Sequence, residues 1–257
     1  MQRTAIRRCG LVIISCDIAT NLTNNCYIAE NNHKMKKTFK ELKREARAAL
    51  KGKWGEGVLL VFVLLLFAFL CDLPSGYYQI SHPGYQQDMM NYGIQWSFLK
   101  FVIPTSLLGI FVFYPLAVGA SNSWRVILDG DKNLVDNAFK LGFGNYFHNI
   151  GGMLLMIILI FLWSLLLLIP GIIKSFAYAM TPFVLVDNPE LSCYEAIKRS
   201  QELMKGNKWR YFLLALSFLG WILLGILSLG IGFFWIIPYI ETTTAAFYYD
   251  IKAQKGL

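Results

Sequence analysis

Six long and almost uncharged apolar runs set the main constraint on how this chain of 257 residues can fold. A membrane-spanning helix needs about 17 to 25 mainly apolar residues to cross a hydrocarbon core of about 30 Å. Composition agrees, because 56% of the residues are hydrophobic and only 16% are charged, against about 25% in ordinary soluble domains. The expected spans lie near residues 55–73, 98–120, 150–168, 172–186, 211–229 and 233–249. The sequence therefore predicts an all-α, polytopic membrane protein with a single integral membrane domain over residues 35–257.

The distribution of basic residues predicts the orientation of these spans. Six spans with a cytoplasmic N-terminus place all of the 24 Lys and Arg residues except Lys100 and Lys174 on the cytoplasmic side. The external loop before the second span, residues 72–97, then contains no Lys or Arg. Both observations follow the positive-inside rule, so we expect both termini in the cytoplasm.

The fourth run, 172–186, is the shortest of the six and leaves a five-span alternative open. In that alternative this run only dips into the bilayer. The C-terminus then lies outside, which exports Lys252 and Lys255 and weakens the charge asymmetry. We therefore favour six spans.

A capped basic segment that ends in glycine and tryptophan occurs twice, and each copy leads into an apolar run. Thr38 with Glu41, and Ser192 with Glu195, have the Ser/Thr-x-x-Glu spacing of a capping box. A looser third copy begins at Asn133. The interfacial anchor candidates are Lys51, Gly52, Trp54, Lys205, Gly206, Lys208 and Trp209.

These copies predict three parallel repeats, each an interfacial amphipathic helix followed by a transmembrane hairpin. In the first helix five residues share an apolar face opposite the basic residues: Phe39, Leu42, Ala46, Ala49 and Leu50. We expect that face to lie on the lipid. Glycine supplies a left-handed turn at the helix end, and tryptophan is favoured at headgroup depth. The anchors set the orientation of the chain; alternatively, they recognise anionic lipid.

Several short motifs between residues 39 and 251 together resemble a known family. They are Lys51-Gly52-Lys53-Trp54, Pro170-Gly171-Ile172-Ile173-Lys174, Asp187-Asn188-Pro189, Lys205-Gly206-Asn207-Lys208-Trp209, Ser217-Phe218-Leu219-Gly220-Trp221, Pro238-Tyr239 and Phe247-Tyr248. This set is similar to an uncharacterised family of bacterial multi-pass integral membrane proteins, domain of unknown function 975. The resemblance implies the bacterial cytoplasmic (inner) membrane and no settled activity. A more distant likeness is to the membrane domain attached to some glycerophosphodiester phosphodiesterases, whose catalytic barrel does not fit in this chain.

Residues 1–34 depart from that family and are polar, with three of the five cysteines. Met35 stands just before the first capping box and looks like a natural start. We therefore expect residues 1–34 to be a disordered or misassigned extension. A lipoprotein signal that ends at Cys16 is the competing interpretation, but it would place the N-terminus outside, against the charge pattern.

No pattern of catalytic, cofactor-binding or metal-binding residues stands out in the sequence. The three histidines form no H-E-x-x-H motif, and the five cysteines form no C-x-x-C pair. The loop that begins at Asp129 has Leu134 and Lys140 where a calcium loop needs glycine and glutamate. The net charge of +8 is spread between apolar runs, which argues against nucleic acid as a partner. We expect no enzyme, no cofactor and no bound metal.

Two functions remain open. The first is a noncatalytic lipid- or partner-binding envelope protein, whose partners would be membrane lipids, anionic ones included, other membrane proteins, or a second copy of this chain. The alternative is a small transporter or channel with Glu241 in its pathway. Glu241 falls within the last apolar run and precedes three threonines, and an ionisable residue inside a membrane span is a functional candidate by default.

Overall fold

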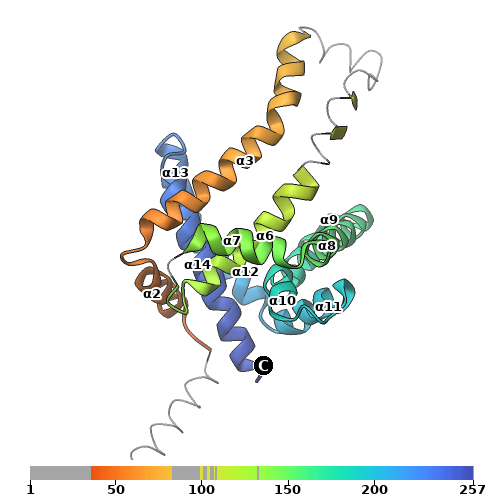
Figure 1. Cartoon of the computed structure of the whole chain (residues 1–257). Coiled ribbons are helices and arrows are strands. Elements are labelled where there is room, and N and C mark those ends of the chain that lie inside the picture. The colour runs from red at the N-terminus through yellow and green to blue at the C-terminus, as the bar shows by residue number, and fades with distance from the viewer. Residues whose placement is uncertain are drawn as a thin grey trace, which may run out of the picture.

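The computed structural model describes residues 36–82, 109–131 and 133–256, with 99–100, 103–104 and 107 between them. Every regular element in these residues is a helix (Figure 1). The predicted extension 1–34 and the proposed start at Met35 lie outside the described residues, as does part of the second predicted span.

The described helices range from 5 to 28 residues in length. They are α2 (Phe39–Leu50), α3 (Trp54–Ser81), the π-helix η1 (Gly109–Phe113), α6 (Tyr114–Val126), α7 (Leu134–Gly144), α8 (Tyr146–Leu166), α9 (Leu168–Tyr178), α10 (Thr181–Asp187), α11 (Cys193–Met204), α12 (Lys208–Leu216), α13 (Leu219–Leu227) and α14 (Phe233–Gln254). Two groups of helices can be distinguished. We call α2, α6, α7, α10, α11 and the C-terminal half of α14 the hub, and we call α3, the α8–α9 pair and the α12–α13 pair the arms (Figure 1).

Four stretches of the described residues are long and apolar enough to cross a membrane. They are Trp54–Cys71, Tyr146–Leu166, Ile169–Asp187 and Lys208–Leu227. Three of them bury only 17% of the residues in their most apolar windows, so most of their side chains face the surroundings. Ile169–Asp187 buries 44% because it passes from α9 into α10, which belongs to the hub. This supports a membrane protein, whereas six spans remain a prediction.

Large exposed apolar side chains are concentrated on the arms. Leu165 and Leu166 on α8 and Leu227 on α13 are examples, and α3 carries a similar series. The C-terminal half of α14, by contrast, is buried from Thr242 to Ile251 except for the half-exposed Thr244 and Tyr249. Exposed apolar surface of this extent marks a lipid-contacting or partner-contacting region, while the hub is packed like a soluble core.

Both predicted capping boxes are present. Thr38 Oγ1 accepts a hydrogen bond from the backbone N–H of Glu41 at 3.3 Å, and the Glu41 carboxylate accepts from the Thr38 N–H at 2.6 Å. Ser192 and Glu195 repeat this arrangement at 3.3 Å and 2.9 Å. These bonds hold the pKa of both glutamates below the ordinary value of 4.5.

The two capped helices also end in the same way. Gly52 has a φ of +79° and Gly206 a φ of +83°, as the sequence predicts for the glycine after each helix. The N–H of Lys53 donates to the carbonyl of Leu50 at 2.9 Å, and the N–H of Asn207 donates to that of Met204 at 2.9 Å. Each glycine therefore occupies the third position of a type II turn, where a side chain would be strained.

The apolar face of α2 contacts protein, so its expected placement on lipid is wrong. Leu42, Ala46 and Leu50 are fully buried, and α2 packs along α14. Lys43, on the basic side, donates to the carbonyl of Ser217 at 2.9 Å between α12 and α13. Burial against another helix removes as much apolar surface from water as insertion into lipid would, so the same pattern is compatible with both.

The cap of α7 and one hairpin turn also differ in detail from the sequence expectations. Asn133 makes no side-chain cap bond; instead the Asp131 carboxylate accepts from the Asn133 N–H at 3.1 Å. The turn expected at residues 169–171 lies at the extended Leu167, and Pro170 falls within the first turn of α9. Proline is tolerated there because the N–H groups of a first helical turn have no intrahelical acceptor.

The short helices of the hub pack in a regular order. α2 packs on α14, α7 on α6, and α11 on α10. The α6–α7 contact is the closest of them, because a Cβ atom on Gly119 would lie 1.8 Å from the Ala138 carbonyl oxygen and one on Gly142 would lie 2.3 Å from that of Pro115. The two helix backbones therefore touch where only glycine fits.

We expect Thr38→Ala and Ser192→Ala each to lower the free energy of unfolding by about 1 kcal/mol, the usual cost of losing an N-cap hydroxyl. The glutamate in each box has a lowered pKa, so its contribution is present above pH 4.5 and is lost as the pH falls through the lowered value. Thermal unfolding in detergent between pH 7 and pH 3 measures both effects. Thr38→Ser is the control and should match the wild type.

We expect Gly119→Ala and Gly142→Ala to destabilise the protein by about 1–3 kcal/mol or more, because each added methyl group would overlap backbone atoms of the facing helix. Gly144→Ala is a matched control on α7, since a Cβ atom there meets nothing within 4 Å. Chemical unfolding of the three variants checks this. Equal stabilities for Gly142→Ala and Gly144→Ala would contradict the close contact.

Candidate functional site: the polar collar of α14

The C-terminal half of α14 passes through the hub and carries a group of polar side chains. Small and aromatic residues such as Ala245, Ala246 and Phe247 are fully buried there. The polar side chains next to them bond to segments far away in the sequence. We call these side chains the collar; they are Tyr248, Tyr249, Asp250 and Lys252.

One carboxylate, that of Asp187 at the end of α10, joins three helices. It accepts hydrogen bonds from the Tyr248 hydroxyl at 2.8 Å and from Lys252 Nζ at 2.6 Å, both on α14. It also forms an ion pair with Arg125 on α6. The side chains of Asp187 and Arg125 are only 9% and 12% exposed, so this pairing takes place mostly out of water. In addition, the Tyr248 ring stacks on Phe183 of α10, with the ring centroids 4.9 Å apart.

A second carboxylate, that of Asp250, fastens the start of the described chain to α14. It pairs with Arg210 of α12 at 2.6 Å, and it accepts from the backbone N–H of Lys37 at 3.2 Å. Arg210 also donates to the Lys37 carbonyl and lies over the Phe247 ring at 5.1 Å. The entry to α2 is thereby held against α12 and α14.

The turn between α6 and α7 is the third segment that the collar holds. The Tyr249 hydroxyl donates to the Asp129 carboxylate at 2.6 Å. Lys53, in the turn after α2, donates to the Asp131 carbonyl at 2.8 Å. The collar therefore contacts α6, α10, α12 and the segments that precede α2 and α7, so its polar groups act mainly to hold helices together.

Four cavities flank these elements. The one beside the collar has a volume of about 280 Å³ and lies between α10, α11 and α14. A shallow groove of about 320 Å³ lies on the outer face of α11, and a cavity of about 370 Å³ adjoins η1 at Cys71 and Gly109. The fourth, of about 660 Å³, is the largest of these four and lies along α2 and the two lysines before it.

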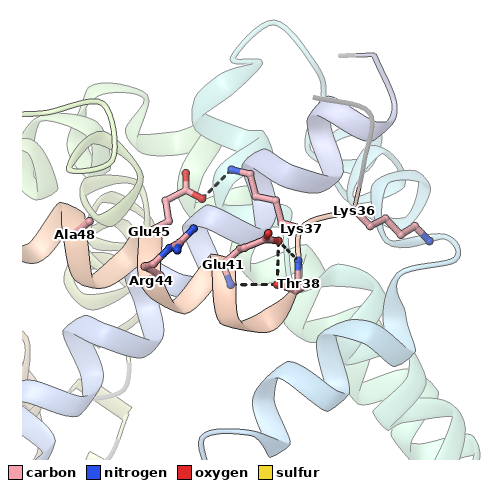
Figure 2. A pocket seen from close by; sticks show the side chains of 7 residues that line it. All are labelled: Lys36, Lys37, Thr38, Glu41, Arg44, Glu45 and Ala48. Carbon is pink, nitrogen blue, oxygen red and sulfur yellow. Dashed lines mark hydrogen bonds and ion pairs between the residues drawn. The ribbon is translucent and has the colours of Figure 1, made fainter. Parts of the chain in front are cut away.

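Figure 2 shows the groove along α2. Its carboxylates are engaged locally: Lys37 Nζ lies 2.8 Å from Glu45 Oε2, and Glu41 is bonded to Thr38. Arg44 lies between these two pairs on the exposed face of the helix. Acidic and basic groups alternate along this groove, so it shows no preference for a ligand of one charge.

The predicted anchors lie in two separate places. Lys51 and Gly52 are exposed at the α2–α3 junction, where Trp54 is half-buried against the core. The other set lies at the α11–α12 junction; there Lys205 and Gly206 are exposed, Lys208 is half-buried, and Trp209 is 69% exposed. The structure thus keeps the anchors at the start of two arms and does not bring them into one site.

Glu241 lies on α14, N-terminal to the collar, and is half-exposed, whereas the neighbouring Thr242 and Thr243 are fully buried. Thr243 donates to the Tyr239 carbonyl one helical turn earlier. None of the four cavities described above is lined by Glu241.

The sequence alone does not mark the collar residues as a site. Asp187 and Tyr248 belong to the motifs Asp187-Asn188-Pro189 and Phe247-Tyr248, which carry the family resemblance, and the structure joins these two motifs by a hydrogen bond. The sequence does show that each of these two residues stands at the end of an apolar run. A charged or hydroxyl group at such a position can form a hydrogen bond or ion pair with another segment. Which partner it meets depends on tertiary packing.

The described part of the chain is all-helical and contains four helical stretches long and apolar enough to span a membrane. Residues 138–255 match the model of a family described as "Protein of unknown function (DUF975)". The resemblance to this uncharacterised family is thus confirmed over the segment that contains α8 to α14, and with it most of the collar and its partners. The likeness to glycerophosphodiester phosphodiesterases is not shown. No curated protein and no solved structure matches the chain.

We expect Asp187→Asn to lower the free energy of unfolding by about 3 kcal/mol, because it leaves Arg125 and Lys252 without their shared buried carboxylate. Glu190→Gln is the control, since Glu190 is exposed three residues further along the chain. Denaturant unfolding of both variants in detergent measures the difference. A variant of Asp187 as stable as the control would show that the cluster contributes nothing.

Proposed function

We propose that this protein is a noncatalytic component of the bacterial cytoplasmic membrane that holds anionic lipid headgroups where its arms leave the hub. In this proposal the chain crosses the membrane six times, both termini are cytoplasmic, and three parallel units each supply a basic segment, an apolar arm and a helix of the hub. The observation that carries the proposal is the exposed lysine near the start of each arm, which forms no ion pair among the described residues.

The carboxylates of the hub are largely engaged within the protein. Carboxylates with a hydrogen-bond or ion-pair partner include Glu41, Glu45, Asp129, Asp131, Asp187, Glu195, Glu202 and Asp250. None of the ion pairs among the described residues, in contrast, includes Lys51, Lys140 or Lys205, and all three are exposed. One such lysine stands shortly before each arm, α3, α8 and α12. Each arm therefore begins near an exposed lysine that forms no ion pair among the described residues.

A positive surface next to an apolar arm suits an anionic bilayer. Each Lys or Arg near such a surface contributes about 1 kcal/mol of attraction. The arms bring these lysines to headgroup depth, provided that their exposed apolar side chains lie in the hydrocarbon. Lipid binding of this kind needs neither a deep pocket nor a catalytic group.

The order of packing supports three units. Each short helix packs on the helix that closes the preceding unit: α7 on α6, and α11 on α10. The first short helix, α2, packs on α14, which closes the last unit. The same capping box and type II turn in α2 and α11 also agree with a repeat.

We expect replacement of Lys51, Lys140 and Lys205 by glutamine to weaken binding of anionic lipid, by roughly fivefold for each removed charge. Exchange of phosphatidylglycerol against phosphatidylcholine in nanodiscs, followed by native mass spectrometry, measures this preference. Lys255→Gln is the control, because Lys255 lies beyond α14, far along the chain from the start of any arm. The corresponding triple arginine variant should bind as the wild type does. An unchanged preference in the glutamine variant would refute the proposal.

A further inference from the structure

The cavity beside the collar is lined by cations and neutral groups and by no carboxylate. Its lining consists of Val184, Asn188, Arg199, Leu203, Tyr248 and Lys252. Its volume of about 280 Å³ lies just below the range of about 300–1,000 Å³ for sites of drug-sized ligands. The cavity therefore suits a small anionic group.

Positive charge around this cavity exceeds the negative charge that faces it. Lys252 shares the Asp187 carboxylate with Arg125, so two cations depend on one acid. Arg199 pairs with Glu202 at 3.4 Å, but the Glu202 side chain is 54% exposed and does not line the cavity. Burial lowers the pKa of Lys252, and the positive charges of Arg125 and Arg199 lower it further. A bound anion would relieve this repulsion.

The groups that line the cavity are hydrogen-bond donors in the main. Arg199 and Lys252 can only donate, and the amide of Asn188 can donate from its nitrogen. Guanidinium and ammonium groups are the usual partners of phosphate oxygens, which accept several charged hydrogen bonds at once. Val184 and Leu203 supply apolar walls beside these donors.

The groove on the outer face of α11 differs in charge although it shares Asn188 and Arg199 with the cavity. Its lining adds Lys198 but also three carboxylates, those of Glu190, Glu195 and Glu202. Three carboxylates repel an anion, so the groove is a poor anion site. The charge pattern favours the inner cavity.

We propose that the cavity between α10, α11 and α14 binds a phosphate group, with Arg199 and Lys252 as its charged ligands. The phosphate belongs either to a small soluble molecule or to a lipid headgroup, since the chemistry that the cavity recognises is the same. This site is separate from the lysines at the base of the arms and stands independently of them.

The test uses the full chain in phosphatidylcholine nanodiscs, titrated with inorganic phosphate by calorimetry at constant ionic strength. We expect saturable binding to the wild type and a loss of about tenfold or more in affinity for Arg199→Gln, because a charged hydrogen bond is removed. Lys198→Gln is the matched control: the neighbouring residue lines the groove but not the cavity, and its replacement should leave affinity unchanged.

Lys252→Gln is the second variant and should also weaken phosphate binding by about tenfold or more, with its unfolding transition recorded to show that the protein is folded. Nanodiscs that contain phosphatidic acid separate the two sources. Weaker apparent phosphate binding there identifies a lipid headgroup as the competitor, and unchanged binding identifies a soluble phosphate compound. The proposal is overturned if the wild type shows no saturable binding, or if Arg199→Gln and Lys198→Gln behave alike.

Discussion

The shared carboxylate of Asp187 is the interaction on which the arrangement of the hub depends. Arg125, Tyr248 and Lys252 reach it from two other helices, and none of these groups could be buried so far without it. A buried ion pair adds little net stability over an apolar contact, but removal of one partner is costly. The cluster therefore fixes which helices meet. The Asp187 cluster joins α6, α10 and α14 within the hub. The arms, which precede these helices in the chain, diverge from the hub (Figure 1).

Local features of the fold could be predicted from the sequence because their causes are local. A capping box needs two residues three positions apart, and both predicted boxes are present at Thr38 and Ser192. The glycines at 52 and 206 adopt the left-handed conformation that their place after a helix implies. The long apolar stretches of the arms follow from composition alone. The family resemblance likewise rests on short motifs that can be seen without the structure.

The hub could not be predicted, because its contacts join residues far apart in the chain. Asp187 lies 61 residues from Tyr248, and no periodicity links the two. The apolar face of α2 shows the same difficulty, since Leu42 and Ala46 have the pattern of a lipid-facing helix but are covered by α14. Hydrophobic patterning says that a face must be covered and does not say by what. Likewise, the cavity at Arg199 exists only once α10, α11 and α14 have been brought together.

The packing of α2 on α14 has a consequence for the order in which the protein is made. Roughly 180 residues separate these helices, so at synthesis rates of about 5–20 residues per second α2 leaves the ribosome some 10–40 s before α14 does. Throughout that interval the face that carries Leu42, Ala46 and Leu50 has no protein to cover it. An amphipathic helix of this kind can lie in the membrane interface with its apolar face toward the acyl chains. The interfacial pattern of α2 thus suits its position before α14 has been made. Once α14 is present, α2 packs against it and becomes part of the hub.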